Sequence, residues 1–142
     1  MGDRRHTGYT VLELVIVVTI ASVLMAMAIP PVTLALDRIS VEAAAGDIGS
    51  LLATARSLAI AGHSSVAVDV DSTAGVIRVR RGTELLVARN IGEAHGVRLS
   101  KTRDSLSYDW RGLGRGAANL SIVVRRRAAA ETVFVSRLGR VR

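Results

Sequence analysis

Hydrophobic residues follow two patterns along this chain, an unbroken apolar run and then a series of short alternating segments. The run extends from Tyr9 to Ile29 and contains one charged residue, Glu13. A helix of this length would measure roughly 31 Å at about 1.5 Å of rise per residue, close to the ~30 Å hydrocarbon core of a bilayer. The run therefore predicts a membrane-spanning helix.

A helical pattern continues after Pro30 and Pro31, whose rings predict a kink or a local break. Apolar side chains recur there at spacings of three and four, the period of a helix with one buried face. They are Val41, Ala44, Ile48, Leu52, Ala55 and Ala59. Gly62 is expected to cap the helix near Ala61. We therefore expect one long kinked helix from about Tyr9 to Ala61, with its second half packed on a head domain.

The rest of the chain consists of short alternating segments separated by turn residues, which predict β-strands. The predicted strands are Ser65–Val70, Val76–Arg80, Glu84–Ala88, Val97–Ser100, Leu106–Trp110, Leu120–Arg125 and Thr132–Ser136. Short strands after a single helix predict an α+β fold, in which an antiparallel sheet packs on that helix.

Glu13 is the exception within the apolar run. A carboxylate in a spanning helix costs about 2.5–3.5 kcal/mol, so it marks a functional site whose partner should be sought. In a generic anchor, Glu13 would instead lie at the headgroup level and be solvated. The preceding residues, MGDRRHTG, form a short basic leader that ends at Gly8. A secretory signal is cleaved after its apolar stretch, whereas a cut after Gly8 keeps that stretch in the mature chain.

The succession of a basic leader, Gly8, Tyr9 and a glutamate five residues after the glycine resembles the type IV prepilin signature. The resemblance implies cleavage after Gly8 by a prepilin peptidase and N-methylation of the new amino terminus on Tyr9. It also implies that Glu13 pairs with the amino terminus of a neighbouring subunit, because each charge relieves the desolvation of the other in lipid. Family members more often carry Phe or Met at the position of Tyr9, a departure that bears on methylation.

Three parts follow from this reading: a leader over residues 1–8, a transmembrane and assembly helix over residues 9–30, and a head over residues 31–142. Arg4 and Arg5 place the leader in the cytoplasm by the positive-inside rule, with the head in the periplasm and the helix in the inner membrane. The head is long enough for its own core. The absence of cysteine leaves its stability to packing and excludes thiol catalysis and thiolate metal sites.

Three head segments extend the resemblance to the GspH/FimT family of minor pseudopilins. They are ARSLAIAGHSSVAVDV (Ala55–Val70), LSYDWRGLGRG (Leu106–Gly116) and VSRLGRVR (Val135–Arg142). The resemblance implies a type IV pilin-like fold and a non-catalytic subunit that assembles with other pseudopilins or pilins near the tip of a periplasmic pilus. Family members serve either type II secretion or type IV pilus assembly and DNA uptake, and both alternatives stay open at this point.

Catalytic chemistry finds no support in the motifs. The sequence has no nucleophile elbow, and its three histidines are scattered without metal-ligand spacing, so neither an enzyme nor a cofactor is expected. Gly112, Gly114 and Gly116 lack the Lys-Ser/Thr ending of a P-loop, and we expect them to form a turn between two strands.

The net charge of +7 is concentrated in the distal half. Residues 31–75 contain two arginines and five acidic residues, whereas residues 76–142 contain 14 arginines, one lysine and five acidic residues. This asymmetry favours an acidic partner, such as nucleic acid or an anionic surface, although an arginine-rich surface without a partner is the alternative.

A basic tail, residues 137–142, ends the chain. In the FimT branch of the family, a Gly-Arg-x-Arg ending is associated with DNA binding. Together with the nearby triple arginine, it would bind the backbone of double-stranded DNA in a sequence-independent, salt-dependent manner. The candidate DNA-binding residues are Arg125, Arg126, Arg127, Arg137, Gly139, Arg140 and Arg142. The alternative is structural, since the secretion branch often ends in a similar segment that finishes the last strand.

Overall fold

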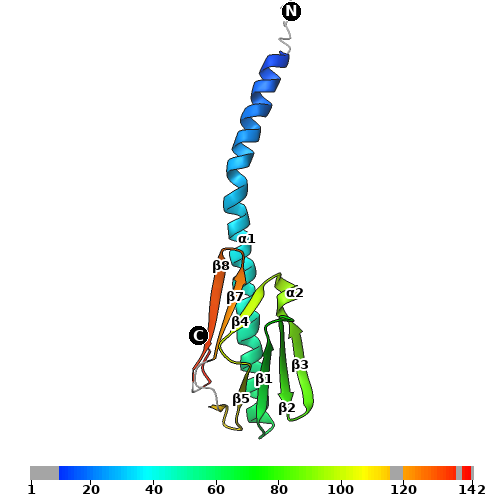
Figure 1. Cartoon of the computed structure of the whole chain (residues 1–142), viewed down its shortest axis with the longest axis vertical. Helices are drawn as coiled ribbons and strands as arrows, with labels where there is room; N and C mark the ends of the chain where they lie inside the picture. The colour runs from blue at the N-terminus through cyan, green and yellow to red at the C-terminus, as the bar shows by residue number, and fades with distance from the viewer. Residues whose placement is uncertain (1–9, 116–119, 137–138, 142) are drawn as a thin grey trace, which may run out of the picture. The chain divides into compact units, whose positions relative to one another are not determined.

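Helix α1 (Val11–Ala61) is the longest element of the computed structural model, which describes residues 10–115, 120–136 and 139–141, with the backbone alone for residues 29–31 (Figure 1). The chain divides into two compact units, Met1–Ala35 and Leu36–Arg142. The α1 backbone is helical across residues 30 and 31. The local break considered from the sequence therefore does not occur, and the kink stays a prediction.

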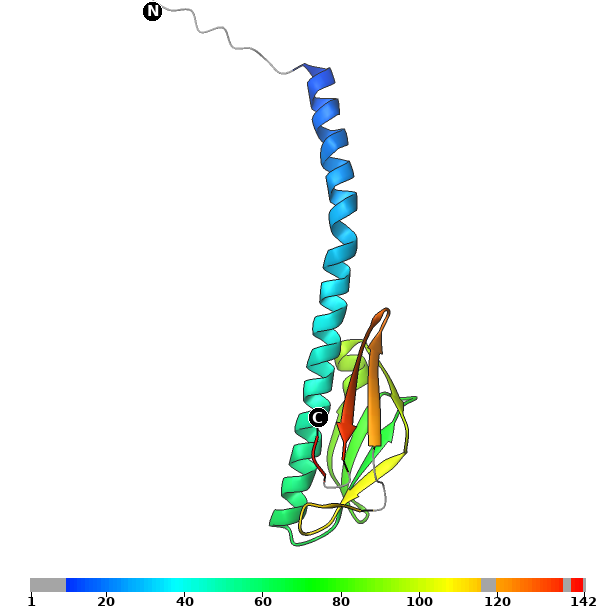
Figure 2. The ribbon, with the colours of Figure 1, turned by 90° about the vertical axis from the view of Figure 1, so that its left-hand side faces the viewer.

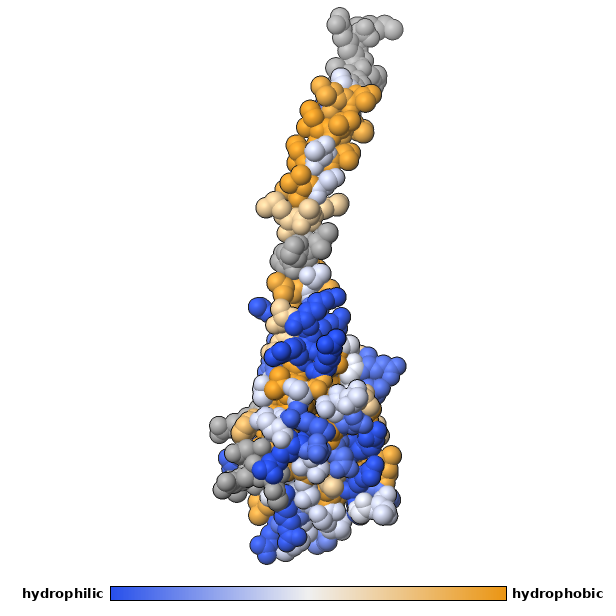
Figure 3. Space-filling view, in the orientation of Figure 1, coloured by the Kyte–Doolittle hydropathy of each residue, from blue (hydrophilic) through white to orange (hydrophobic). Residues whose placement is uncertain are grey.

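The visible face of α1 in the first unit is mostly apolar (Figure 3), and Leu, Val, Ile, Ala and Met occupy most positions from Val11 to Ala28. All described side chains from Thr10 to Ala28 are exposed in the isolated chain, and α1 is long and apolar enough to cross a membrane. A helix that is apolar all round needs an apolar environment to cover it. The sequence prediction of a membrane anchor agrees with this surface.

The second unit contains all of the buried core residues in the described parts of the chain. The predicted stripe of α1 is confirmed, because Val41, Ala44, Ile48, Leu52, Ala55 and Ala59 are buried there. Leu51 is also buried, and together these side chains form one cluster with residues of the strands. In Figure 2 this half of α1 runs along one face of the sheets.

The C-terminal end of α1 has the hydrogen bonds of a Schellman motif. The Ser64 N–H donates to the Ala59 carbonyl and the His63 N–H to the Ile60 carbonyl, both at 3.2 Å. Gly62 occupies the expected cap position, but the left-handed residue is His63, with φ of 45°. A Cβ on Gly62 would lie 3.0 Å from the Leu58 carbonyl oxygen, so close approach explains this glycine.

The strands form two antiparallel sheets, where the sequence suggested one. The first has the order β3-β2-β1-β5-β6 and the second the order β4-β7-β8. The strands are β1 (Val66–Asp71), β2 (Val76–Arg81), β3 (Glu84–Asn90), β4 (Arg98–Lys101), β5 (Ser105–Tyr108), β6 (Gly114–Arg115), β7 (Leu120–Arg126) and β8 (Ala129–Val135). The predicted α+β class is confirmed, and both sheets contribute to the core under α1.

A short helix, α2 (Ile91–His95), links β3 to β4 and has no counterpart in the sequence predictions. Asn90 accepts a hydrogen bond from the Glu93 N–H at 3.1 Å, and its amide donates to the Glu93 carboxylate at 2.7 Å. Gly96 ends the helix in the left-handed conformation. Asn90, Glu93 and Gly96 have the spacing of a helix cap and a helix end, and this spacing could have predicted α2 from the sequence.

Candidate functional site

Glu13 lies in the first turn of α1. Its backbone N–H donates to the Thr10 hydroxyl oxygen at 3.2 Å, so Thr10 caps the helix. A carboxylate in a first turn is favoured by the helix dipole. The Thr-x-x-Glu spacing is a capping signature that the sequence analysis missed, and it gives Glu13 a local role beside the expected one in assembly. Gly8 and Tyr9, the expected cleavage and methylation residues, lie outside the described residues.

Two of the three consecutive arginines bind Asp37 at the beginning of the second unit. Arg126 Nε lies 2.9 Å from Asp37 Oδ1, and an Arg127 nitrogen donates to both Asp37 oxygens at 2.9 and 3.1 Å. Asp37 is only 2% exposed. A buried carboxylate requires such partners, because its desolvation is otherwise uncompensated. Asp37 is not among the stripe residues expected from the sequence, and its burial depends on arginines far along the chain.

Arg126 is fixed by further contacts. It donates to the Ser40 hydroxyl at 2.9 Å and to the His95 carbonyl at 2.8 Å. The His95 ring in turn lies 2.9 Å from Asp47 of α1. These contacts join α1, α2 and the turn between β7 and β8, so Arg126 has a structural role that the sequence did not predict.

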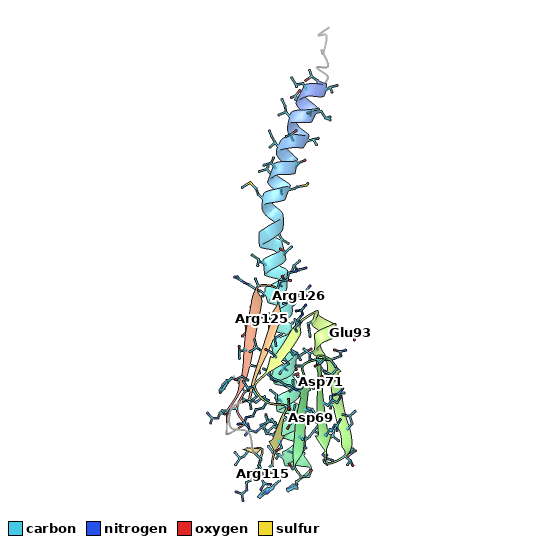
Figure 4. The ribbon with its side chains drawn as sticks, viewed as in Figure 1. Asp69, Asp71, Glu93, Arg115, Arg125 and Arg126 are labelled. Carbon is cyan, nitrogen blue, oxygen red and sulfur yellow. The ribbon has the colours of Figure 1, made fainter. Side chains whose placement is uncertain are left out.

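Arg125 is exposed, like Arg127, but differs from both neighbours because it has no ion pair among the described residues. It lies directly opposite Arg98 in the β4–β7 ladder. An open hollow of about 400 Å³ is lined by Gly96, Arg98, Arg125, Arg126 and Arg127. Arg125 and Arg126 lie at the end of β7 that leads into the β7–β8 turn (Figure 4), and hydrophilic residues gather over this turn (Figure 3).

The described part of the tail is folded against the head. Val141 forms a β-bridge with Val135 at the end of β8, the Gly139 N–H donates to the Ser136 carbonyl, and the Ser136 N–H donates to the Arg140 carbonyl. Gly139 is buried with φ of 72°, whereas Arg140 is exposed. Arg137 and Arg142 lie outside the described residues. The described part of the tail therefore turns back after β8 and pairs with its last residue, and both the structural and the DNA-binding alternatives stay predictions.

The structure does not bring the two groups of candidate arginines together. Val135, which bridges the tail, pairs with Leu120 at one end of the β7–β8 hairpin, whereas Arg126 pairs with Ala129 at the other end. Six residues of strand separate these ends, roughly 20 Å at about 3.3 Å per residue. The expectation that the tail and the triple arginine form one grip is wrong for Arg140 and Arg125–Arg127.

The glycine-rich segment after β5 forms a turn stabilised by Asp109. Its carboxylate accepts hydrogen bonds from the backbone N–H groups of Leu113 and Arg111, each at 2.9 Å. The bond from Leu113, followed by that from Arg111, lowers the pKa of Asp109. The chain then enters β6, which pairs with β5. The prediction of a turn between two strands is confirmed for Gly112, whereas Gly114 belongs to β6 and Gly116 lies outside the described residues.

Comparison with known proteins supports both halves of this description. Residues 3–29 match the family model described as the prokaryotic N-terminal methylation motif. The fold is similar to the type IV minor pilin FimU of Pseudomonas aeruginosa, with a TM-score of 0.64 and 14% identity, covering 74% of this chain and 88% of FimU. The chain has a type IV pilin-like fold.

A second solved structure has the same pilin-like fold. It is the minor pseudopilin EpsH from the type 2 secretion system of Vibrio cholerae, with a TM-score of 0.57 and 14% identity, covering 72% of this chain and 94% of EpsH. No curated protein matches the pilin-like chain in sequence. The resemblance to type IV prepilins and the pilin-like fold are thus confirmed, and α1 is long and apolar enough to anchor the chain in a membrane.

Proposed function

We propose that the chain is a minor pilin or pseudopilin, a structural subunit that enters a filament through its N-terminal helix. The observation that carries this proposal is the prepilin-type motif of residues 3–29, joined to a head with the fold of FimU and EpsH. In this function a prepilin peptidase cuts after Gly8, the new amino terminus on Tyr9 is methylated, and Glu13 pairs with the amino terminus of a neighbouring subunit.

Processing and assembly can be tested separately in cells that contain a prepilin peptidase. Mass spectrometry of the purified chain should find Tyr9 as the first residue, with one added methyl group. Glu13→Ala should leave cleavage intact and remove the chain from sheared filament fractions, because a lone ammonium group in lipid then loses its partner. Glu42→Ala, an exposed α1 carboxylate of the head, is the matched control. Normal incorporation of Glu13→Ala would contradict the proposed pairing.

The finer proposal is a pseudopilin of type II secretion, with the leader in the cytoplasm and the head in the periplasm. The folded tail supports this alternative, because Gly139 and Val141 have structural contacts that need no ligand. Deletion of the gene should then leave secreted enzymes in the periplasm without changing DNA uptake. The opposite result would favour a subunit of a type IV pilus.

The second candidate function is binding of double-stranded DNA through the tail. The exposed side chain of Arg140 on an otherwise fixed segment favours it. Fluorescence anisotropy of a head fragment over a salt series measures this binding. Loss of affinity in Arg140→Ala/Arg142→Ala, but not in Arg89→Ala/Arg103→Ala, would support a DNA receptor. Equal DNA affinity of the two variants would show that the binding depends on the overall positive charge of the head and not on the tail.

A further inference from the structure

Four arginines line the hollow at the β7–β8 end of the head, and none of the described residues that line it is acidic. Arg98 and Arg125 are directly opposite each other in the β4–β7 ladder. Like charges at opposed strand positions destabilise a sheet. Neither guanidinium has an ion pair or hydrogen bond with another described residue. The head thus holds two unneutralised cations side by side, which an anion between them would stabilise.

The other two arginines make the hollow rigid and keep it positive. Arg126 is bound to Asp37, Ser40 and the His95 carbonyl, and is therefore held in place. Asp37 is the single carboxylate that Arg126 and Arg127 contact among the described residues. One negative charge therefore faces four positive ones. Guanidinium groups bind phosphate oxygens in pairs, so the hollow has the chemistry of a phosphate site.

The position of Asp37 in the chain bears on the source of a phosphate that could bind here. No charged residue occurs between Glu13 and Asp37, so the arginines bind the first charged residue after the apolar run. They are thus bound to a residue that follows the end of that run by eight positions, or about 12 Å of helix. Leu36 and Ile39, on either side of Asp37, are 56% and 61% exposed. Exposed apolar side chains beside arginines are typical of a surface that contacts lipid headgroups.

We propose that this hollow binds the phosphate of an anionic phospholipid headgroup and so holds the head of the unassembled subunit against the membrane surface. The inference rests on the membrane anchoring in the proposed function. Nucleic acid is disfavoured as the occupant because duplex binding needs contacts to several successive phosphates. Arg140 lies at the other end of the β7–β8 hairpin from the hollow. The described residues therefore form no short row of arginines that joins Arg140 to the hollow.

Native mass spectrometry of the full chain in a non-ionic detergent tests the proposal, with phosphatidylglycerol or phosphatidylcholine added. Arg98→Ala/Arg125→Ala removes the two free cations and leaves the Asp37 contacts intact. We expect this variant to bind phosphatidylglycerol roughly 25-fold more weakly, since each arginine near an anionic surface contributes about fivefold. Arg103→Ala/Arg115→Ala, which removes two exposed arginines outside the hollow, should bind like the unchanged chain.

Added competitors distinguish the sources of the phosphate. Inorganic phosphate at millimolar concentration and a short DNA duplex should both fail to displace phosphatidylglycerol. Unchanged lipid binding by Arg98→Ala/Arg125→Ala, an equal loss in the control variant, or displacement by either competitor would each overturn the proposal. The assay uses unassembled subunits, so failure of the Glu13 assembly test would leave its result standing.

Discussion

Gly139 shows how a single residue fixes the end of the chain. Its φ of 72° is accessible to glycine at little cost, and a Cβ there would lie 2.9 Å from Tyr108 Cε1 and 3.0 Å from the Gly112 carbonyl oxygen. Tyr108 is completely buried, so its ring has little room to move. The Gly-Arg ending that resembles a DNA-binding signature therefore also has a steric explanation.

Gly139→Ala should destabilise a Leu36–Arg142 fragment by about 2–4 kcal/mol, because backbone strain and overpacking against Tyr108 add together. Gly82→Ala is the matched control, since Gly82 also has a positive φ but no atom lies within 4 Å of the added Cβ. It should cost only about 1 kcal/mol from the strain. Urea unfolding measures both values. Equal losses in the two variants would show that contact with Tyr108 contributes nothing.

At the scale of elements, α1 and the β7–β8 hairpin are joined through Asp37. The hairpin turn contains Arg127 with φ of 47°, and this left-handed residue directs the chain back along β8. Arg126, the last residue of β7, and Arg127, the first residue of the turn, bind the same carboxylate. The contact links the beginning of the head's helix to strands 90 residues later in the chain.

Asp37→Ala should destabilise the Leu36–Arg142 fragment by about 2 kcal/mol. Breaking a buried pair costs about 3–5 kcal/mol, but the side chains of Arg126 and Arg127 are 32% and 70% exposed and are partly screened by water. Asp69→Ala removes the exposed pair with Arg80 and should change stability by less than about 0.5 kcal/mol. Urea unfolding measures the loss of unfolding free energy in each variant. Similar small losses in the two variants would contradict a structural role for Asp37.

The elements that could be predicted from the sequence are those with strong local patterns. The α1 stripe from Val41 to Ala59 and the β1 and β2 alternation needed only the spacing of apolar residues. Asp37 could not be predicted in this way, because its partners are distant in the chain and the arginines there agreed equally well with an arginine-rich surface without a partner. The division into two sheets was missed for a similar reason, since β4 pairs with β7 rather than with its neighbour β5.

At the scale of the whole molecule, stability in acid depends on carboxylates in turns of the head. The Ala74 N–H, the largest contributor, lowers the pKa of Asp71 through a 3.0 Å hydrogen bond, and the Arg78 side chain adds to this effect. Asp109 has its pKa lowered by the Leu113 N–H. A carboxylate whose pKa is lower in the folded state stabilises the fold above its unfolded pKa, and this contribution disappears as pH falls through the folded pKa.

The melting temperature of the Leu36–Arg142 fragment should therefore fall as pH is lowered from about 5 to 2, around the unfolded aspartate pKa of about 3.9. Asp71→Asn/Asp109→Asn should melt at a lower temperature at pH 7 and lose less on acidification, because two of the groups that bind protons on unfolding are gone. Calorimetry over this pH range measures both effects. An unchanged slope in the variant would assign the acid sensitivity to other groups.

The shared use of α1 by both units has a mechanical consequence. A pull on the anchor enters the head at Leu36 and next reaches Asp37, where Arg126 and Arg127 are bound. The buried face of α1, from Val41 to Ala59, follows that contact along the helix. Load along the helix is then carried in shear by the ion pairs and the whole packed face at once. The head would resist extraction forces that could peel a terminal strand away one residue at a time.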